Sequence, residues 1–324
     1  MTTINITPKD SLSEILKTAS PHSRIILAPG TYREKLEIYV NDIELVGHTA
    51  EDTIIVWDDY AKKLDETGAE YNTFRTYTVA VLAPNVTFRN LTVENDARSP
   101  ETKGQEVALT VYADEFLAED CRFISTQDTV FCGPLPPDLI ERYDGFLKDA
   151  LRTGEYQRQI FRNCLIAGNV DFIFGCGDAL FEDCEIRSVY DVRGHGYTAA
   201  PAHAPEQEVC FVFHRCRFTY ASGSPREGDD GRSIAIGRPW HNYPKVAILD
   251  SDFCDQMDPL GWPTNWGKPY VETSPDLHLY EYGNRGLRAD MNGRAKWTGL
   301  RALTPAEAEE YMVENVLGSD PARW

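Results

Sequence analysis

The chain has 324 residues, 42% of them hydrophobic, and repeat folds often run this long as one unit, so we expect a single domain over residues 1–324. Asp and Glu total 51 against 32 Lys and Arg, which gives a formal net charge of −19 and excludes nucleic acid as a natural partner. The same negative charge disfavours a densely ionised polyanion.

From the N-terminus, the first ten residues contain neither the basic segment nor the apolar stretch of a secretory signal peptide. No later apolar run reaches the ~18 residues of a membrane span. Eight cysteines in such a chain are typical of reduced thiols. The sequence therefore predicts a cytosolic monomer that contacts no membrane. The alternative is a secreted protein from which a signal peptide has been removed.

The first predicted element is a short amphipathic helix over residues 11–19, with Asp10 or Ser11 as its N-cap. Its apolar face carries Leu12, Ile15 and Leu16. We expect this helix to cover the first coil of a repeat fold, because the terminal repeats of such folds must be capped.

A six-residue pattern recurs between residues 80 and 255: an apolar residue, two polar residues, a small or apolar anchor, a variable residue and an apolar residue. Its anchors are Leu91, Cys121, Cys164, Cys184 and Cys216, with a weaker copy at Ser251. The copies are rich in strand formers, turn residues separate them, and no long 3.6-residue periodicity is present. The sequence therefore predicts an all-β parallel β-helix, a solenoid in which each coil buries its inward face by stacking on its neighbours.

Four of the anchors are cysteines. Because buried Cys behaves as a small hydrophobe, we expect them to stack as an interior ladder of free thiols. The sharper alternative is a zinc site made of Cys210, His214 and Cys216. No fourth ligand follows at a conventional spacing, so the sequence favours the ladder and no metal.

The last predicted element is a helix over residues 305–316, with Thr304 as its cap and Pro305 in its first turn. The predicted architecture is therefore a β-helix with a capping helix at its N-terminal end and a tail of helix and loop at its C-terminal end.

The sequence contains no Gly-x-Ser-x-Gly turn, no phosphate-binding Gly-rich loop and no His-Glu-x-x-His pair. It does contain two aspartates, Asp128 and Asp171, within otherwise apolar segments. An isolated Asp usually caps a turn, but strand formers flank both of these. Because neighbouring parallel strands are ~4.8 Å apart, aspartates on adjacent coils can lie close enough for one to act as nucleophile and the other as acid.

Seven segments in order along nearly the whole chain carry a more specific signal: Gly30-Thr-Tyr-Arg-Glu34, Gly104-Gln-Glu-Val-Ala-Leu109, Ser125-Thr-Gln-Asp-Thr129, Gly168-Asn-Val-Asp-Phe-Ile-Phe-Gly175, Gly237-Arg-Pro-Trp240, Gly261-Trp-Pro-Thr-Asn-Trp266 and Tyr280-Glu-Tyr-Gly-Asn284. Together they resemble the pectin methylesterase (pectinesterase) family. The resemblance implies a right-handed parallel β-helix and an esterase that removes C6 methyl esters from galacturonate units and releases methanol.

The resemblance also implies a role for each polar residue of the site. Asp171 is expected to attack the ester carbonyl, and Asp128 to protonate methanol and then activate water. Gln105 and Gln127 are expected to donate to the oxyanion, a contribution of about 2.7–4 kcal/mol per donor in other enzymes. Arg238 is expected to pair with Asp171 and keep it ionised. The resemblance implies no cofactor.

Two aromatic residues are expected to bind substrate: Trp240 through the face of its ring, and Phe174 as part of the pocket for the methyl group. Strand alternation opposes part of this assignment, because Phe174 and Asp171 should face opposite sides, as should the neighbours Gln127 and Asp128. We therefore expect a bend or a bulge at Gln127 or Asp128.

One departure from a regular repeat is the separation of Asp128 and Asp171, which are 43 residues apart, about twice the length of one coil. The excess lies in residues 133–157, which are rich in Pro and charge and typical of an inserted loop. Because both flanking motifs are intact, we expect the loop to project outward without separating the two carboxylates.

The predicted compartment, the negative charge and the insertion together favour an intracellular esterase for short methylated oligogalacturonates. An inert surface loop is the simpler interpretation of the insertion. Three other functions stay open: a polygalacturonase-like hydrolase, a pectate lyase and a non-catalytic carbohydrate-binding relative. The Gln–Asp pair and Gly-Arg-Pro-Trp favour an esterase over a hydrolase, and no acidic calcium site of a lyase is recognisable. A non-catalytic relative is expected to have lost Asp128, Asp171 or Arg238.

Overall fold

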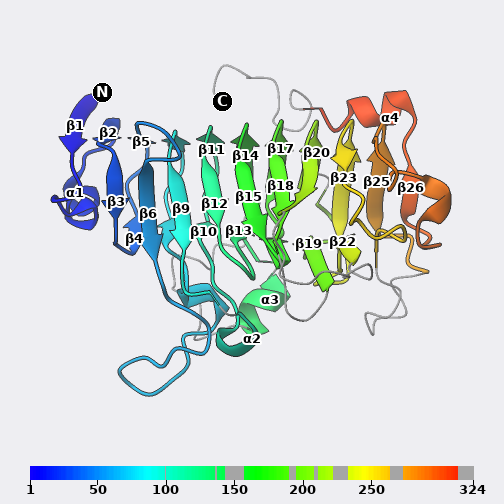
Figure 1. Cartoon of the computed structure of the whole chain (residues 1–324), viewed down its shortest axis with the longest axis horizontal. Helices are drawn as coiled ribbons and strands as arrows, with labels where there is room; N and C mark the ends of the chain where they lie inside the picture. Colours follow the sequence, from blue (N-terminus) through cyan, green and yellow to red (C-terminus); the bar gives the residue numbers. More distant parts are fainter. Residues whose placement is uncertain are drawn as a thin grey trace.

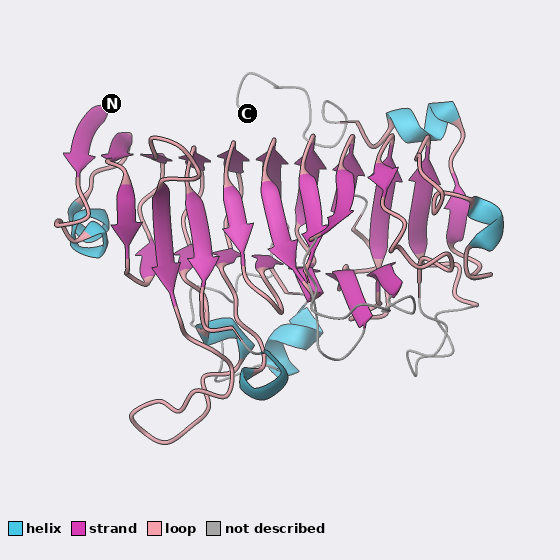
Figure 2. Ribbon diagram, viewed as in Figure 1, coloured by secondary structure: helices cyan, strands magenta, loops and turns pink. Residues whose placement is uncertain are grey.

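The computed structural model describes residues 1–98, 100–135, 137–142, 157–189, 195–207, 211–221, 233–262 and 273–312. In these residues the strands form three parallel sheets that run along a solenoid (Figure 1). The chain passes from sheet to sheet in turn, and each strand pairs with strands of the neighbouring coils. Few helices accompany the stack of strands, and they lie at its ends and along one side (Figure 2). The predicted parallel β-helix is confirmed.

Each sheet takes one strand from successive coils. Sheet A contains β1 (Thr2–Ile6), β2 (Ser23–Leu27), β5 (Ile43–Val46), β8 (Val86–Arg89), β11 (Phe116–Glu119), β14 (Arg158–Arg162), β17 (Asp178–Glu182), β20 (Phe211–His214), β23 (Lys245–Leu249), β25 (His278–Tyr282) and β26 (Leu300–Ala302). Sheet B contains β3 (Gly30–Tyr32), β6 (Thr53–Trp57), β9 (Thr92–Asn95), β12 (Arg122–Ile124), β15 (Leu165–Gly168), β18 (Glu185–Ser188), β21 (Arg217–Tyr220) and β24 (Asp252–Phe253). Sheet C contains β4 (Leu36–Ile38), β7 (Val79–Val81), β10 (Leu109–Val111), β13 (Val130–Cys132), β16 (Val170–Gly175), β19 (His195–Pro201) and β22 (Ser233–Gly237).

Residues at the same position of the six-residue sequence pattern pair with one another between neighbouring coils. Its first residues pair along sheet A in the order Phe88, Ala118, Phe161, Phe181, Phe213 and Ile248. Its last residues pair along sheet B in the order Val93, Phe123, Ile166, Ile186, Phe218 and Phe253. The ring of Phe181 stacks on Phe161 at 4.9 Å and on Phe213 at 4.8 Å between centroids. The preceding coil continues both rows, since Leu45 pairs with Phe88 and Ile55 with Val93, but its sequence lacks the six-residue pattern.

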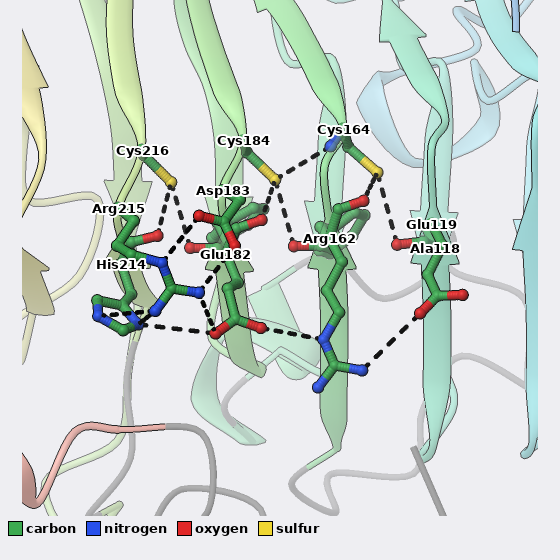
Figure 3. A network of polar contacts seen from close by, with 12 residues as sticks. Ala118, Glu119, Arg162, Cys164, Glu182, Asp183, Cys184, His214, Arg215 and Cys216 are labelled. Atoms are coloured by element: carbon green, nitrogen blue, oxygen red, sulfur yellow. Dashed lines mark hydrogen bonds and ion pairs between the residues drawn. The ribbon is translucent and has the colours of Figure 1, made fainter.

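The anchor residues occupy the corner between sheets A and B, and the four anchor cysteines are buried free thiols. Figure 3 shows Cys164, Cys184 and Cys216 of this row. All four thiols donate to backbone carbonyl oxygens at 3.2 Å: Cys121 to Glu119, Cys164 to Arg162, Cys184 to Phe161 and Cys216 to Phe181. Ser251 continues the row, since its hydroxyl accepts the Cys216 N–H at 3.0 Å. The predicted ladder is confirmed.

A row of alternating basic and acidic side chains crosses sheet A in register, formed by Arg89, Glu119, Arg162, Glu182 and His214. Figure 3 shows Arg162 between Glu119 and Glu182, at 3.9 and 3.0 Å. His214 belongs to this row, with its Nδ1 3.7 Å from Glu182, whereas the Cys216 thiol lies in the interior ladder. The third residue of the zinc alternative, Cys210, lies outside the described residues.

The N-terminal helix, α1 (Leu12–Thr18), caps the solenoid as predicted. Ser11 is its N-cap and accepts the backbone N–H of Glu14 at 3.4 Å. Leu12 and Leu16 are buried in the main core, whereas Ile15 packs against its edge.

The C-terminal helix, α4 (Pro305–Glu309), begins where predicted, with a capping box between Thr304 and Glu307. Its predicted end at residue 316 is wrong, because the helix ends at Glu309 and a turn follows through residue 312. Glu309 and Glu310 place two carboxylates at the negative end of the helix dipole, which disfavours further turns. Residues 313–324 lie outside the described part of the chain.

Two short helices, α2 (Pro100–Lys103) and α3 (Pro137–Arg142), lie together beside the lower edge of the sheets in Figure 1. Two 3-10 turns, η1 (Thr73–Arg75) and η4 (Met291–Gly293), interrupt loops. None of the helices in the described residues has the length and apolar composition needed to cross a membrane.

The outer face of sheet C has an apolar cluster of its own. Strands β13, β16 and β19 contribute Phe131, Phe174 and Ala200, the turn η1 contributes Phe74, and α3 contributes Leu139 and Ile140. Because loops and α3 cover this face, a concave site forms above sheet C.

Candidate active site

Asp128 and Asp171 lie opposite each other on adjacent coils. The pairings on either side of them are in one register: Gln127 with Val170, and Val130 with Ile173. The insertion at residues 133–157 does not separate the two aspartates, because β13 and β16 pair directly. This expectation is confirmed. Within the insertion, residue 136 and residues 143–156 lie outside the described residues.

The backbone turns sharply at both aspartates, and this resolves the conflict with strand alternation. Asp128 has φ +63° and Asp171 has φ +51°, both in the left-handed region. The register between β16 and β19 also shifts between Val170 and Ile173. The expected bend is therefore present at Asp128, and Asp171 forms a second one that the sequence did not predict. As a result, Asp171 and Phe174 line the same pocket.

The pocket has a volume of about 240 Å³ and contains every residue that the sequence singled out. Its lining is Thr73, Phe74, Gln105, Gln127, Asp128, Asp171, Phe174, Ala200, Arg238 and Trp240. These residues come from successive coils and from the loop that precedes β7. Three of them, Thr73, Phe74 and Ala200, were not predicted.

Arg238 follows β22 and holds Asp171 through two hydrogen bonds. Its Nε donates to Asp171 Oδ1 at 2.7 Å and its Nη2 to Oδ2 at 2.5 Å. The guanidinium also lies 4.5 Å from the ring centroid of Tyr197. Burial lowers the pKa of Arg238, but the hydrogen bonds and charge of Asp171, with a smaller attraction from Asp128, outweigh burial and raise that pKa. The arginine therefore stays charged and favours the carboxylate form of Asp171.

Gln105 and Gln127 lie on irregular backbone at neighbouring coils, and both side chains line the pocket. The Gln105 carbonyl accepts the N–H of Ala61 at 2.9 Å, and the Gln127 carbonyl accepts the N–H of Glu106 at 3.0 Å. These contacts fix the backbone of both glutamines, and both residues line the pocket together with the two carboxylates.

The apolar side of the pocket is a group of three rings. Trp240 stacks on Phe74, with 6.4 Å between centroids, and lies 5.8 Å from Phe174 at an angle of 59°. The backbone N–H of Trp240 donates to Pro201 at 3.1 Å, which fixes the loop after β22 against β19. A flat sugar face or a methyl group can pack against such a surface.

Glycine is required at the start of the Gly237-Arg-Pro-Trp240 motif because the backbone of β22 runs very close to its neighbours. A Cβ atom at Gly237 would lie 2.5 Å from the Ala199 carbonyl oxygen and 3.0 Å from the Trp262 ring. Trp262 is itself buried in the core. This close packing sets the direction in which Arg238 leaves the strand.

The described residues contain no group of three or more His, Cys, Asp or Glu side chains arranged to hold a metal ion.

Sequence reasoning missed four residues of the site because no motif marks them. Phe74 and Thr73 lie on a long loop, and Tyr197 and Ala200 lie in β19 among ordinary strand residues. For Phe74 the available signal is the density of aromatic residues between Tyr71 and Tyr77.

Fold and pocket together define a parallel β-helix protein with two carboxylates and an arginine in one cleft, and comparisons with known proteins identify its family. Residues 3–134 and 142–320 match the family model described as Pectinesterase. A tomato (Solanum lycopersicum) pectinesterase/pectinesterase inhibitor is 30% identical over 310 residues, 93% of this chain and 47% of that protein. A pectinesterase of Arabidopsis thaliana is 29% identical over 326 residues, 98% of this chain and 75% of that protein.

Solved structures give the same result. The carrot pectin methylesterase superposes with a TM-score of 0.79 at 25% identity, covering 97% of this chain and 92% of that chain. A pectin methylesterase in complex with a hexasaccharide has a TM-score of 0.77 at 25% identity, covering 98% of each chain. The shared fold is the right-handed parallel β-helix. The chain belongs to the pectinesterase family, a family of carboxylic ester hydrolases, and spans about half the length of the tomato relative.

Proposed function

We propose that the protein hydrolyses C6 methyl esters of galacturonate units and releases methanol, with Asp171 as the nucleophile and Asp128 as the general acid and base. The observation that carries the proposal is the two-point contact between Arg238 and Asp171, directly opposite Asp128. Family membership supports the chemistry, and the related pectin methylesterase structure with a hexasaccharide supports a sugar chain as the substrate.

In the first half-reaction, an oxygen of the Asp171 carboxylate attacks the ester carbonyl carbon. The carbonyl electrons move onto oxygen, and the side-chain amides of Gln105 and Gln127 donate hydrogen bonds to that oxyanion. Collapse of the tetrahedral intermediate breaks the bond to the methoxy oxygen, which takes the proton of Asp128 and leaves as methanol. The sugar is then held as an acyl-enzyme on Asp171.

In the second half-reaction, the ionised Asp128 removes a proton from a water molecule, whose oxygen attacks the acyl carbon. The same two glutamines bind the second oxyanion. Collapse releases the free carboxyl group of the product and restores the Asp171 carboxylate, while Asp128 keeps the proton for the next cycle. The ring of Trp240 holds the sugar during both steps, and the ring of Phe174 holds the methyl group until methanol leaves at the end of the first.

The test of this assignment is Asp171→Asn. An amide cannot act as the nucleophile, so we expect methanol release from methylated pectin to fall by about 10³-fold or more with the fold intact. The matched control is Asp120→Asn, at an exposed corner residue that also has a positive φ of 53°, and it should keep the parent rate. Substantial methanol release by Asp171→Asn would overturn the assignment. Reducing ends or unsaturated ends from the parent would instead identify a hydrolase or a lyase.

We also propose that the preferred substrates are short methylated oligogalacturonates. The described part of the insertion, α3, packs beside the pocket, with Leu139 and Ile140 in the same apolar cluster as the pocket rings. Asp138 in α3 lies 2.6 Å from Nε2 of His241, the residue after Trp240. The match to the family omits residues 135–141, so this helix is a local feature of the chain. The net charge of −19 further disfavours long ionised polymer.

The chain-length proposal is tested by kcat/KM values for methylated trimers or tetramers and for highly methylated polymer. We expect the parent to prefer the oligomers, and His241→Ala or a shortened insertion to reduce that preference several-fold, because the helix is no longer held over the groove. Asp252→Asn, which removes the exposed 2.8 Å pair with Arg285, is the control. Preference of the parent for polymer, or an unchanged ratio in both variants, would contradict the proposal.

Because polymeric pectin is too large to enter a cell, we propose that the enzyme acts on short oligomers inside the cell. The seven described cysteines are all free thiols, which suits a reducing compartment. Fractionation of the source cells should recover the protein in the cytosol, and recovery from the medium would count against this part of the proposal.

A further inference from the structure

Glu106 is a buried acidic residue next to the pocket for which the proposed chemistry has no use. It follows Gln105 and precedes β10, and its exposed fraction is 0%. Charged side chains are rarely buried so completely unless they are paired or bind a ligand. Its hydrogen bonds join it to the next coil, and in the described residues only one of its two carboxyl oxygens, Oε2, has a partner.

Glu106 contacts three consecutive residues of the next coil. Its backbone N–H donates to the Gln127 carbonyl at 3.0 Å. Its own carbonyl accepts the hydroxyl of Ser125, and its carboxyl oxygen Oε2 accepts the hydroxyl of Thr126. One residue thus ties the segment of Gln105 to the segment of Gln127.

These contacts matter because neither glutamine lies in a regular strand. Residues 104–107 are irregular, and Gln127 has a single isolated bridge, to Val170. Without a ladder of backbone hydrogen bonds, the relative position of the two amides depends on the contacts between the segments. Oxyanion donors act only when they are held within about 0.5 Å of the productive geometry.

We propose that Glu106, in its neutral form, is a positioning residue that holds Gln105 and Gln127 in register for the oxyanion. This inference rests on the roles proposed above for the two glutamines. The neutral carboxyl group still accepts the Thr126 hydroxyl through its carbonyl oxygen. An ionised carboxylate would place a negative charge one residue away from a donor to a developing negative charge, and so oppose the reaction.

The surroundings of the carboxyl group favour its neutral form up to about pH 6. Burial raises the pKa of Glu106 to about 6, although the hydrogen bond from Thr126 acts in the opposite direction. The charged groups around it are Lys103 and Glu101 of α2, which lower and raise this pKa, and the Arg98 backbone N–H lowers it slightly. On the next coil its partner is the uncharged Thr126.

The experiment compares Glu106→Ala, Glu106→Gln and the parent in methanol release from about pH 5 to about pH 7.5. We expect Glu106→Ala to lower kcat about tenfold while KM stays within about twofold, because the loss concerns the transition state. Glu106→Gln should restore kcat, since its amide keeps an acceptor for Thr126. The ratio of parent kcat to Glu106→Gln kcat should fall as the pH rises through about 6, because only the parent ionises.

Asp178→Asn is the matched control. Asp178 lies on β17, where burial raises its pKa to about 6 and Gln207 donates to it at 2.6 Å. It does not line the pocket, so its variant should follow the parent kcat at every pH. If Glu106→Ala does not fold, the pH profile of Glu106→Gln decides alone.

Failure of this inference can be told apart from failure of the proposed function. If Gln105→Ala and Gln127→Ala keep the parent kcat, the oxyanion assignment itself is wrong. If those two variants lose kcat while Glu106→Ala keeps it, or if Glu106→Gln and the parent share one pH profile, the role of Glu106 is overturned and the proposed function stands.

Discussion

Asp128 and Asp171 adopt left-handed backbone conformations in segments that are otherwise extended. A non-glycine residue held in a sparsely populated region costs on the order of 1–3 kcal/mol, and such residues cluster at functional sites. Here the conformation has a direct geometric result. It turns both carboxylates out of the strand alternation and into the pocket, so that Asp171 shares it with Phe174 and Asp128 shares it with Gln127.

The contact of Arg238 with Asp171 is tested by the variant Arg238→Lys. In Arg238→Lys a single ammonium replaces the planar guanidinium, so one of the two hydrogen bonds and the packing on Tyr197 are lost. We expect kcat for methanol release to fall by roughly 10- to 100-fold with a smaller change in KM, because Asp171 remains ionised but is poorly aimed.

A second two-point pair in the chain supplies the control for that variant. Arg215 binds Asp183 through Nε at 2.8 Å and Nη2 at 2.7 Å, on an exposed corner beside sheet A. Arg215→Lys makes the same chemical change away from the pocket and should leave kcat unchanged. Equal losses of kcat in the two variants would show that Arg238→Lys acts by lowering stability and not by misorienting Asp171.

Among the elements, sheet A shows how side chains on neighbouring coils stabilise the stack. Glu182 lies between Arg162 on one coil and His214 and Arg215 on the next (Figure 3). The hydrogen bond from His214, followed by those from Arg162 and Arg215, outweighs burial and lowers the pKa of Glu182 to about 2. The coils are therefore joined by charge as well as by the stacked rings of the core.

This arrangement predicts a pH dependence of stability. The folded pKa of Glu182 lies below its ordinary value of 4.5, so its contribution is present above pH 4.5 and is lost as the pH falls toward about 2. With allowance for solvent screening, Glu182→Gln should lower the free energy of unfolding by about 1–2 kcal/mol near neutral pH. Urea unfolding from about pH 6 to about pH 3 should show this difference shrinking, because the parent then protonates.

The exposed Glu66, exchanged for Gln, is the control for that series, and its stability should follow the parent throughout. A deficit of Glu182→Gln that stays constant down to low pH would show that packing, and not charge, carries the effect.

In the whole molecule, each coil contacts the coils before and after it. The end coils lack one of these neighbours and must be covered by other elements. Helix α1 covers the first coil with Leu12 and Leu16. Near the other end, Arg294 and Glu281 form a buried ion pair, with 2.6 Å between Arg294 Nε and Glu281 Oε1. Loops of different lengths cover the outer face of sheet C, and the pocket lies on this face.

Much of the fold was predictable because a solenoid encodes its register locally. The residues at the same position of each copy of the pattern are the residues that pair between coils, and the cysteine ladder follows directly. The copy through Leu45 was missed because a longer segment separates its two halves. The end of α4 was missed because apolar residues continue at helical spacing beyond the acidic residues at which the helix ends.

The sequence by itself determined the register of the coils and marked seven residues that line the pocket, because both depend on short segments whose chemistry is local. Only the tertiary structure decided that Thr73, Phe74 and Ala200, from a long loop and a neighbouring strand, complete the pocket and that Tyr197 packs on Arg238. It also decided the bend at Asp171 and the contacts of Glu106. These depend on where loops fold back onto sheet C, and no local pattern specifies a contact between segments that are far apart in the chain.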